Sequence, residues 1–377
     1  MAEGVVVHYI SVRYANSMGF SRRLAAFFLF AVLSSWVCLR HRAHVVFATS
    51  TPLTICLPAI ACSLVQRIPM VFEVRDLWPE VPIAMGELKN PVLIAAARLL
   101  ESMAYRRSSR VVALAPGMRQ GVLNAGFPPN RIAVIPNGAD LNIFDPKIPT
   151  SDVAPDWLSR SDHMVLYAGT IGRANGVAYI PRLAAAIHQV APTSRLVFAI
   201  IGDGACRQAV EAEAERLGVK DHTVFFLGTL TKMQVAKWMR QCSATIMTYD
   251  GPSIVYRDSV SNKFFDSLAA SRPVIANFSG FSTLIATSVN AGLIVPKDDL
   301  ESAARHCIDL LADSDRLHHM GRNALRLGRD LFSRDVLASD LERVLVDAVR
   351  HPNRPRVTKI GYHFVEMWND ICKQKPT

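Results

Sequence analysis

Short apolar runs rich in β-branched residues alternate with longer helical stretches along the first part of the chain. The runs occupy residues 5–10, 44–48, 69–74, 110–114 and 131–135. A run of this length with few polar interruptions is typical of a strand buried on both faces of a parallel sheet. Alternation of such strands with helices predicts βαβ units, so we expect an α/β domain built on a doubly wound sheet.

The same pattern returns after a clear break. Pro136-Asn-Gly-Ala-Asp140 ends the first series, and a segment rich in Pro and Asp continues to about Asp162. Further buried-strand runs follow at residues 164–169, 196–202, 224–228, 244–247, 273–276 and 292–295. The two series predict two Rossmann-like domains, residues 1–150 and 151–350, which a linker joins and a cleft separates.

The composition indicates a folded protein with an anionic partner. The chain has 377 residues, of which 50% are hydrophobic, so it can bury more than one large core. Its 42 Lys and Arg exceed its 32 Asp and Glu, and the net charge of +10 favours a nucleotide, a phospholipid surface or a nucleic acid. Because no basic run is interleaved with aromatics, we expect no nucleic-acid partner.

Cysteine and histidine show neither a disulfide framework nor a metal site. The seven Cys are scattered, mostly in apolar runs, and form no C-x-x-C pair, which is typical of reduced thiols in a cytoplasmic protein. The His residues lack metal-ligand spacing. Asp313 and Asp315 resemble an acid pair for a metal, but their helical context indicates a turn or a helix cap. We therefore expect no metal and no other cofactor.

Leu24 to Leu39 forms a nearly uncharged run flanked by Arg22-Arg23 and Arg40-His41-Arg42. The run is shorter than the ~20 residues that span a bilayer, so it predicts a buried or interfacial helix. It also lacks the cleavage pattern of a signal peptide. Two interpretations stay open, a helix packed on the first sheet and a helix that contacts an anionic membrane.

The loops after the strands of the second series hold the candidate binding residues. Gly169 to Gly176 follows the first strand, Gly202 to Gly204 the second and Gly228 to Leu230 the third, while Asp258 to Asp266 precedes a later strand. Ligands of doubly wound sheets lie beyond the carboxyl ends of the strands. A single Gly-x-Gly is usually only a turn, but four loops that converge on one cleft indicate a ligand site.

The last of these segments has the most specific layout. Ser261 is a natural N-cap for a short helix that begins at Asn262. Free backbone N–H groups at that helix start, with Lys263 beside them, suit the diphosphate of a nucleotide sugar, and Asp266 can accept hydrogen bonds from sugar hydroxyls. Taken alone, an ordinary capped helix with one surface Asp explains the segment better; the neighbouring loops favour the binding site.

Read together, these motifs resemble the retaining nucleotide-sugar glycosyltransferases of family 4, which have the GT-B fold of two Rossmann-like domains. The resemblance covers nearly the whole chain and rests on Ile135-Pro-Asn-Gly-Ala-Asp140, Tyr167-Ala-Gly169, Ile201-Gly-Asp-Gly204, Phe226-Leu-Gly228, the two-acid segment and Ala291-Gly-Leu-Ile-Val-Pro296. Residues 71–80 resemble the branch that builds O-antigen and capsule repeats, including L-fucosamine transferases. In this fold terminal helices cross back to the first domain, so we expect residues 351–377 to pack there.

The resemblance assigns roles to the two acids. Asp258 and Asp266 fall on the family's Glu-x7-Glu motif, each one methylene shorter. The match implies that Asp258 contacts the donor sugar and that Asp266 holds the nucleotide ribose. The other donor-binding candidates at the strand ends are Gly169, Gly202, Gly204, Gly228, Leu230, Ser261 and Asn262.

The family's usual cations for the diphosphate are missing from the first loop of the second domain. Relatives commonly have an Arg and a Lys where this chain has Thr170 and Asn175. Arg173 and Lys263 are the nearest cationic substitutes. Fixed positive groups and helix N–H donors would stabilise the charge that gathers on the departing phosphate.

The first domain carries a second pair of candidates. Arg75-Asp76 occupies the place where many relatives have a His that faces the donor sugar, so both residues join Asp258 as catalytic candidates. A strand-end salt bridge explains the pair equally well. For Trp78-Pro79 beside them we expect packing rather than stacking on a sugar.

The beginning of the chain departs from the family. Relatives open with a strand, a glycine-rich loop and a helix on the acceptor side, whereas residues 5–10 match one of their later strands. Two explanations stay open, a late start site and a shortened variant with an altered acceptor pocket.

The resemblance implies a metal-independent retaining glycosyltransferase. We expect a nucleotide-sugar donor, a UDP sugar that is N-acetylated or deoxy, and a lipid-linked saccharide acceptor. The enzyme would act at the cytoplasmic face of the plasma membrane with peripheral membrane contact. Two alternatives are a GT-B sugar-nucleotide epimerase and a pseudo-enzyme that binds a nucleotide sugar without catalysis.

Overall fold

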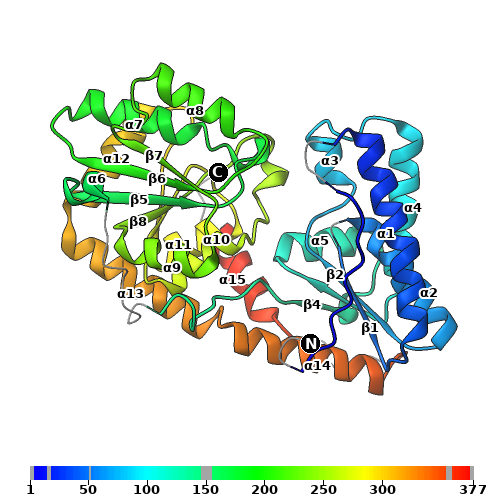
Figure 1. Cartoon of the computed structure of the whole chain (residues 1–377). Coiled ribbons are helices and arrows are strands. Elements are labelled where there is room, and N and C mark those ends of the chain that lie inside the picture. Colours follow the sequence, from blue (N-terminus) through cyan, green and yellow to red (C-terminus); the bar gives the residue numbers. More distant parts are fainter. Residues whose placement is uncertain (1–3, 15–17, 51, 146–154, 354–358, 374–377) are drawn as a thin grey trace. The chain divides into compact units, whose positions relative to one another are not determined.

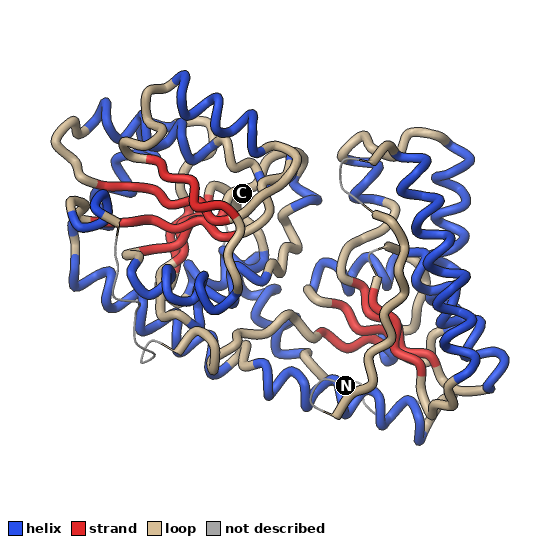
Figure 2. Tube along the Cα trace, in the orientation of Figure 1, coloured by secondary structure: helices blue, strands red, loops and turns tan. Residues whose placement is uncertain are grey.

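The computed structural model describes residues 4–14, 18–50, 52–145, 155–353 and 359–373 and divides into two compact units. Met1–Ile135 and Ser339–Val365 form the first unit, and Pro136–Ala338 and Glu366–Thr377 form the second. Each unit has one parallel sheet covered by helices (Figures 1 and 2). The division falls at Ile135, ahead of the boundary at 150/151 that we expected, which lies outside the described residues.

The first unit has a four-stranded parallel sheet in the order β1-β2-β3-β4. The strands are β1 (Val46–Thr49), β2 (Met70–Val74), β3 (Arg110–Ala113) and β4 (Ile132–Val134). The helices before the linker are α1 (Phe20–Arg40), α2 (Cys56–Gln66), α3 (Glu80–Ala84), α4 (Pro91–Arg107) and α5 (Pro116–Asn124), with the 3-10 turns η1 (Leu53–Ile55) and η2 (Pro129–Arg131). All four strands lie within or next to runs that the apolar pattern predicts.

The run at residues 5–10 is the exception, because it forms no strand. Val5 and Val6 are about two-thirds exposed and Tyr9 is 94% exposed. An apolar run becomes a strand only when its backbone N–H and C=O groups pair with a neighbouring strand. Residues 5–10 do not extend the sheet at its edge strand β1, which pairs with β2 alone. The prediction of a first strand there was wrong.

The second unit has a six-stranded parallel sheet in the order β10-β9-β8-β5-β6-β7. The strands are β5 (His163–Ala168), β6 (Leu196–Ile201), β7 (Val224–Gly228), β8 (Ala244–Met247), β9 (Val274–Ala276) and β10 (Gly292–Ile294). The helices are α6 (Asp156–Ser159), α7 (Tyr179–Val190), α8 (Arg207–Arg216), α9 (Lys232–Gln241), α10 (Asn262–Ala269), α11 (Phe281–Ser288), α12 (Leu300–Ala312) and α13 (Ser314–Asp330), with the 3-10 turns η3 (Arg173–Asn175) and η4 (Ser253–Val255). The strands confirm the predicted second doubly wound domain.

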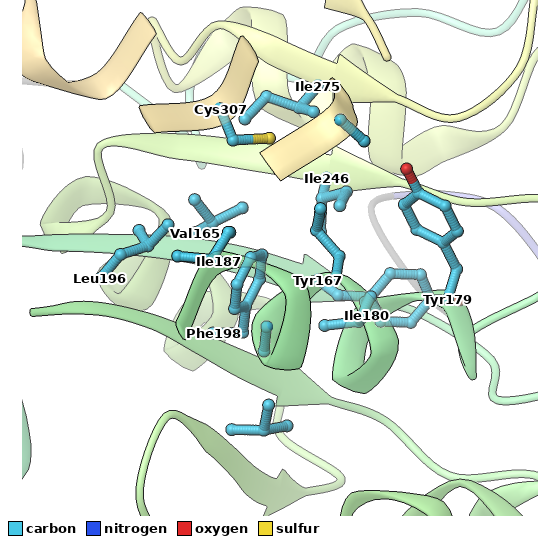
Figure 3. Packing of buried hydrophobic residues seen from close by; sticks show 14 of the residues in the cluster. Val165, Tyr167, Tyr179, Ile180, Ile187, Leu196, Phe198, Ile246, Ile275 and Cys307 are labelled. Atoms are coloured by element: carbon cyan, nitrogen blue, oxygen red, sulfur yellow. The ribbon is translucent and has the colours of Figure 1, made fainter. Parts of the chain in front are cut away.

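The core of this unit lies between the sheet and the helices that cover it (Figure 3). Side chains of the central strands, such as Val165, Tyr167 and Phe198, are at most 1% exposed. They pack with Ile180 from α7 and Cys307 from α12. Continuous apolar strands of this kind are what a sheet covered on both faces requires.

The strand order reverses at β5, which pairs with β6 on one side and β8 on the other. The chain runs outward from β5 to β7, returns to β8 and then runs outward to β10. Such a reversal leaves a crevice at the carboxyl ends of the central strands, where loops diverge to opposite faces. We therefore expect a ligand site beyond the ends of β5 and β8, the neighbours between which the order reverses.

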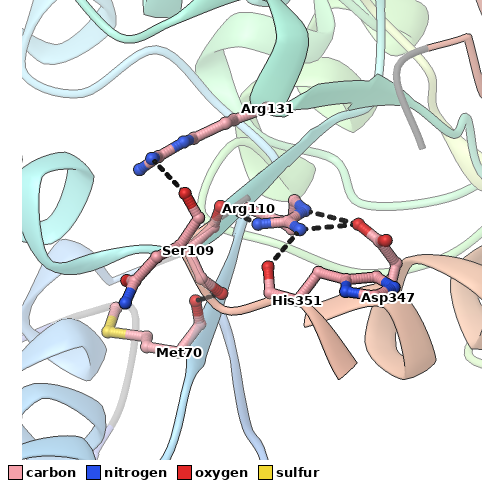
Figure 4. A network of polar contacts seen from close by, with 7 residues as sticks. Met70, Ser109, Arg110, Arg131, Asp347 and His351 are labelled. Carbon is pink, nitrogen blue, oxygen red and sulfur yellow. Dashed lines mark hydrogen bonds and ion pairs between the residues drawn. The ribbon is translucent and has the colours of Figure 1, made fainter. Parts of the chain in front are cut away.

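The helix α14 (Arg334–Arg350) begins in the second unit and belongs to the first from Ser339 onward. It is fixed there by a buried ion pair, in which Arg110 of β3 donates from Nε and Nη2 to Asp347 at 2.8 and 2.6 Å (Figure 4). Arg110 also donates to the carbonyls of Ser109 and His351. These four bonds satisfy a guanidinium that is buried at the centre of the unit.

The tail that we predicted at residues 351–377 is shared between the units. Val134 of β4 donates its N–H to the carbonyl of Ile360 at 3.2 Å, which brings the start of the helix α15 (Tyr362–Lys373) to the first sheet. From Glu366 onward the helix belongs to the second unit, where Trp368 packs edge-on against Phe281 at 5.7 Å.

Candidate functional site

A cavity of about 670 Å³ lies in the second unit where the strand order reverses. Its walls come from the loops after β5, β6 and β7 and from the start of α10. The lining residues are Phe144, Ala168, Gly169, Thr170, Asn175, Ile201, Gly202, Asp203, Thr229, Leu230, Lys232, Val235, Ser261, Asn262, Lys263 and Asp266. The volume is in the range of small-molecule and cofactor sites.

Backbone hydrogen bonds join the glycine loops into one floor under the cavity. Gly169 N–H donates to the carbonyl of Ile201 at 2.9 Å, and Gly202 N–H donates to the carbonyl of Gly228 at 2.8 Å. A Cβ at position 202 would lie 1.9 Å from the Gly169 carbonyl oxygen, and one at Gly204 would lie 2.6 Å from that of Ile171. Glycine is required at both positions because two backbone segments approach each other closely there. The Gly-x-Gly motif after a strand is the sequence signal for this close approach.

The start of α10 presents backbone donors to the cavity. Ser261 is the N-cap, as predicted, but its side chain makes no capping hydrogen bond. The first N–H groups of a helix have no partner within it, and together with the helix dipole they favour an anion. An uncapped helix start on a cavity wall is therefore suited to bind an anion.

Lys263 adds a positive charge beside that helix start. Its Nζ donates to the hydroxyl of Tyr167 at 3.2 Å and lies 4.7 Å from the centre of the same ring. Within the described part of the chain it forms no ion pair. Burial without a neighbouring carboxylate lowers the pKa of Lys263 to about 8. An ammonium group left without a counter-charge on a cavity wall is suited to bind an anionic ligand.

Tyr167 explains why Lys263 points into the cavity. The Tyr167 hydroxyl donates to the carbonyl of Thr170 at 2.7 Å and accepts from Lys263, so it joins the loop after β5 to α10. Gly169 makes room, because a Cβ there would lie 3.1 Å from Lys263 Cε. The Tyr-Ala-Gly motif thus positions the lysine.

Asp266 lies one turn further along α10 on the same wall. Its carboxylate accepts no hydrogen bond from the described residues. Burial raises the pKa of Asp266 to about 6, and the charges of Lys232 and Arg334 only partly oppose that rise. A carboxylate with unused acceptor capacity can receive the hydroxyls of a sugar.

A second lysine, which the sequence analysis missed, completes the cavity. Lys232 opens α9 behind a capping box of Thr231 and Gln234. Its Nζ donates to Asp140 Oδ2 at 3.0 Å, and Arg334 binds the same oxygen at 2.9 Å. Although burial opposes ionisation, these cations lower the pKa of Asp140. The Thr-x-x-Gln capping box was the signal in the sequence that marks Lys232 as the first helical residue.

The Pro136-Asn-Gly-Ala-Asp140 motif acts within the second unit. Asn137 Nδ2 donates to the carbonyl of Val260 at 2.7 Å, just before α10. A Cβ at Gly138 would lie 2.8 Å from Arg334 Cα. The motif therefore fastens the approach to α10 and the start of α14 beside Asp140.

The predicted donor-binding residues divide into two groups. Those that line the cavity are Gly169, Thr170, Asn175, Gly202, Leu230, Ser261, Asn262, Lys263 and Asp266. Those that do not are Arg173, Gly204 and Gly228, and the catalytic candidate Asp258 does not line the cavity either. Arg173 is exposed on η3, and the two glycines hold the loops together behind the wall. The structure thus does not bring Arg173 to the cavity as the substitute cation that we expected.

Asp258 is buried, at 4% exposed, behind η4. Its Oδ2 accepts from Arg257 Nε at 2.9 Å and Nη2 at 2.7 Å. Its Oδ1 is buried and has no partner among the described residues. The carboxylate is therefore held by Arg257 and does not line the cavity.

The first-unit candidates lie at the end of β2. Arg75 Nη1 lies 3.7 Å from Glu73 Oε2, and Arg75 N–H donates to Ser50 Oγ at 2.9 Å. This is the strand-end ion pair of the alternative interpretation. Asp76 is exposed beside it. Their roles toward a donor stay predictions.

Comparison with known proteins gives two family models that match consecutive parts of the chain. Residues 1–138 match the glycosyl transferase 4-like domain, and residues 162–313 match the glycosyl transferases group 1. The two matches correspond to the two sheet-containing units.

Curated relatives are distant. The chain is 25% identical to an alpha-maltose-1-phosphate synthase of Mycolicibacterium smegmatis over 69% of this chain and 68% of that protein. It is 28% identical to a D-inositol 3-phosphate glycosyltransferase of Segniliparus rotundus over 68% of this chain. That match spans 56% of the relative, little more than half its length.

Solved structures share the fold. Anabaena Alr3699/HepE in complex with UDP and glucose superposes with a TM-score of 0.65 at 16% identity, over 87% of this chain and 83% of that one. Sucrose-phosphate synthase from Thermosynechococcus elongatus gives 0.69 at 15% identity, over 90% and 84%. The predicted fold of two Rossmann-like domains is confirmed.

Proposed function

We infer that this chain, which belongs to the glycosyltransferases with the GT-B fold, transfers a sugar from a nucleotide-diphosphate donor to a lipid-linked saccharide. The family models and the superposed structures support the family and the fold. The donor class is supported by the cavity of the second unit. The acceptor is proposed from the surface of the first.

The observation that carries the donor assignment is the unpaired ammonium of Lys263 beside the uncapped start of α10. A diphosphate would satisfy both at once, because helix N–H groups and a lysine are complementary to phosphate oxygens. As the sugar leaves, charge gathers on the same phosphate, so groups fixed before the reaction lower the barrier. We assign Lys263 and the α10 N-terminus to stabilisation of the leaving group.

The neighbouring acids take the remaining parts of the donor. Asp266, with its free acceptor oxygens, is assigned to the ribose hydroxyls. Asp258 is assigned to the donor sugar from its place in the two-acid motif alone, because its buried carboxylate pairs with Arg257 and does not line the cavity. Lys232, which also lines the cavity, is bound by Asp140 and would supply a second cation for the diphosphate. Transfer of this kind requires no metal in the proposed mechanism.

The proposed lipid-linked acceptor rests on the helix α1. It is 21 residues long, longer than the apolar run alone indicates, and its span Ser21–Arg40 is long and apolar enough to cross a membrane. Only 11% of its apolar window is buried. The helix packs along α2, where Gln66 donates to the carbonyls of Cys38 and His41, so we propose that it lies on the membrane surface rather than across it.

The finer assignments are also proposals. A peripheral enzyme at the cytoplasmic face of the plasma membrane would act in cell-surface polysaccharide synthesis, as the motif at residues 71–80 suggests. The relatives are named for maltose 1-phosphate and inositol 3-phosphate, so their names support neither a lipid acceptor nor an N-acetylated or deoxy donor sugar.

One incubation separates the candidate functions. The purified chain is given labelled UDP-sugars with and without a membrane lipid extract, and a Lys263→Met variant serves as the control for the donor site. We expect label in the lipid fraction only with the extract and the unaltered chain. Release of an isomerised nucleotide sugar without extract would indicate an epimerase. Binding without turnover under both conditions would indicate a pseudo-enzyme.

A further inference from the structure

The first unit contains a large cavity whose walls are almost entirely apolar. It measures about 510 Å³ and lies between the first halves of α1 and α4, closed by η1 and by the segment before α3. The walls include Leu24, Phe27, Trp78, Leu93, Ala97 and Leu100. A cavity of this size with almost entirely apolar walls offers few polar partners to ordered water and is suited to a hydrocarbon ligand.

Charge is confined to two of the residues that line this cavity, Arg23 and Glu87. Arg23 belongs to the Arg22-Arg23 pair at the start of α1, and Arg40 and Arg42 flank the other end of the helix. An apolar interior with a guanidinium on its wall is complementary to a lipid that has an uncharged chain and an anionic head.

The helix α1 buries small side chains and exposes large apolar ones, which is the reverse of an ordinary core helix. The side chains that it buries are small, Ala26, Ala31 and Ser34. Those that it exposes are large and apolar and lie at i, i+4 spacing on one face, at Leu24, Phe28, Val32 and Trp36. All of them except Leu24 are more than half exposed. Leu24 belongs both to this stripe and to the cavity wall.

A second exposed stripe follows α4, the other wall of the cavity. Val92, Leu99 and Met103 are 72%, 63% and 43% exposed and share one face of that helix. Contiguous apolar surfaces of this extent mark interaction sites. The cavity therefore lies between two helices that both present apolar side chains to the outside.

We propose that this cavity binds the hydrocarbon chain of the lipid-linked acceptor, with its phosphate head beside Arg23. The proposal rests on the function proposed above and adds the part of the acceptor that is recognised apart from its saccharide. The exposed stripes of α1 and α4 lie against the bilayer, and the chain passes from the bilayer into the cavity between them. Each CH₂ transferred from water into such a site improves affinity about fourfold.

Trp78 on the cavity wall provides a direct probe of occupancy. The experiment uses the full chain with Trp36→Phe, which removes the exposed tryptophan of α1. This protein is mixed in detergent micelles with a polyisoprenyl phosphate that bears a nitroxide on its hydrocarbon chain. A nitroxide inside the cavity quenches Trp78. Ala97→Phe fills the cavity, whereas Ala95→Phe changes an exposed position of the same helix that does not line it.

We expect saturable quenching that Ala97→Phe weakens at least tenfold and Ala95→Phe leaves unchanged. Equal quenching in both variants would overturn the proposal, because the chain would then bind outside the cavity. Equal quenching by a nitroxide-labelled phosphatidylglycerol would overturn the assignment to the acceptor, since any membrane lipid would do.

Binding of UDP, measured on the same samples, separates this proposal from the proposed function. UDP should bind all three proteins equally, because the donor cavity lies in the second unit. Loss of UDP binding only in Ala97→Phe would indicate that this variant misfolds. Ala97→Leu, which adds a smaller side chain, then replaces it in the test, and the proposal requires that Ala97→Leu weaken quenching while UDP binding stays intact. Quenching without any UDP binding in the unaltered chain would retain the lipid site and refute the donor site.

Discussion

Replacement of Lys263 by Met tests the donor site most directly. Met keeps the length of the side chain and removes its charge, so the cavity wall loses only the ammonium group that we assign to the diphosphate. A hydrogen bond to a charged group contributes about 1.5–3 kcal/mol. We therefore expect Lys263→Met to weaken UDP binding by about 10- to 150-fold.

The lowered pKa of Lys263 gives this prediction a pH dependence. In the free protein the pKa is about 8, below the ordinary value of 10.5, and a bound diphosphate would raise it again. UDP affinity should thus be constant between about pH 6 and pH 8 and fall about tenfold for each pH unit above pH 8. At pH 8 binding should take up about half a proton, because half of the free protein is then deprotonated at this site.

The same substitution should stabilise the unliganded protein. A lysine whose pKa is lowered on folding costs stability at every pH below its folded pKa, and the cost vanishes as pH rises from about 8 to 10.5. At pH 7 the shift corresponds to a cost on the order of 3 kcal/mol. Lys263→Met therefore raises the melting temperature while it weakens binding, a combination that a purely structural lysine would not produce.

Titration calorimetry with UDP at several pH values, in buffers of different ionisation enthalpy, measures affinity and proton uptake together. Arg173→Met is the matched control, because Arg173 is exposed in the adjacent loop and does not line the cavity. An affinity of Lys263→Met equal to that of the unaltered chain, or a profile of the unaltered chain that is flat from pH 7 to about 9.5, would refute the reasoning.

Three further perturbations test the rest of the structure. The raised pKa of Asp266, about 6 against an ordinary 3.8, predicts that UDP affinity falls as pH drops below 6; equilibrium binding should find that Asp266→Asn is weaker at pH 7 and lacks this fall. Gly202→Ala places a Cβ 1.9 Å from the Gly169 carbonyl, so melting and UDP binding should both deteriorate, whereas Gly218→Ala, which meets no neighbour, should cost only about 1 kcal/mol. Asp347→Asn leaves the buried Arg110 without its ion pair and should lower the free energy of unfolding by about 3–5 kcal/mol in denaturant titration. Glu301→Gln, at an exposed ion pair, should change that free energy by less than about 1 kcal/mol. Equal effects of the two substitutions would contradict the burial argument.

The secondary structure of this protein follows closely from its apolar pattern. Each of the ten strands lies in or beside a mainly apolar run, because a strand covered on both faces has few positions for a polar side chain. Arg110 of β3 is an exception, and Asp347 pairs with it. The segment at residues 5–10 has the same pattern and is not a strand, since the composition of a run does not determine whether its backbone pairs with a neighbouring strand.

The helix α1 shows a second limit of the pattern. Its length and hydrophobicity are evident in the sequence, and so is its possible contact with a membrane. Which of its faces is buried depends on the surface of α2, and that surface selects Ala26, Ala31 and Ser34 rather than the larger side chains. The cavity beside it, bounded by elements up to Leu100, has no signature in the sequence at all.

What the sequence by itself determined is the set of strand-end loops and the helix start at Ser261, since tight turns, caps and close backbone approach demand particular residues at particular local spacings. Tertiary structure decided which of those residues share one cavity. Lys263, Asp266 and Lys232 meet there although the last lies about thirty positions from the other two, whereas Asp258 and Arg173 do not line it. The physical reason is that the charge and the burial of a side chain depend on neighbours distant in the chain. Tyr167 positions Lys263, and Asp140 binds Lys232.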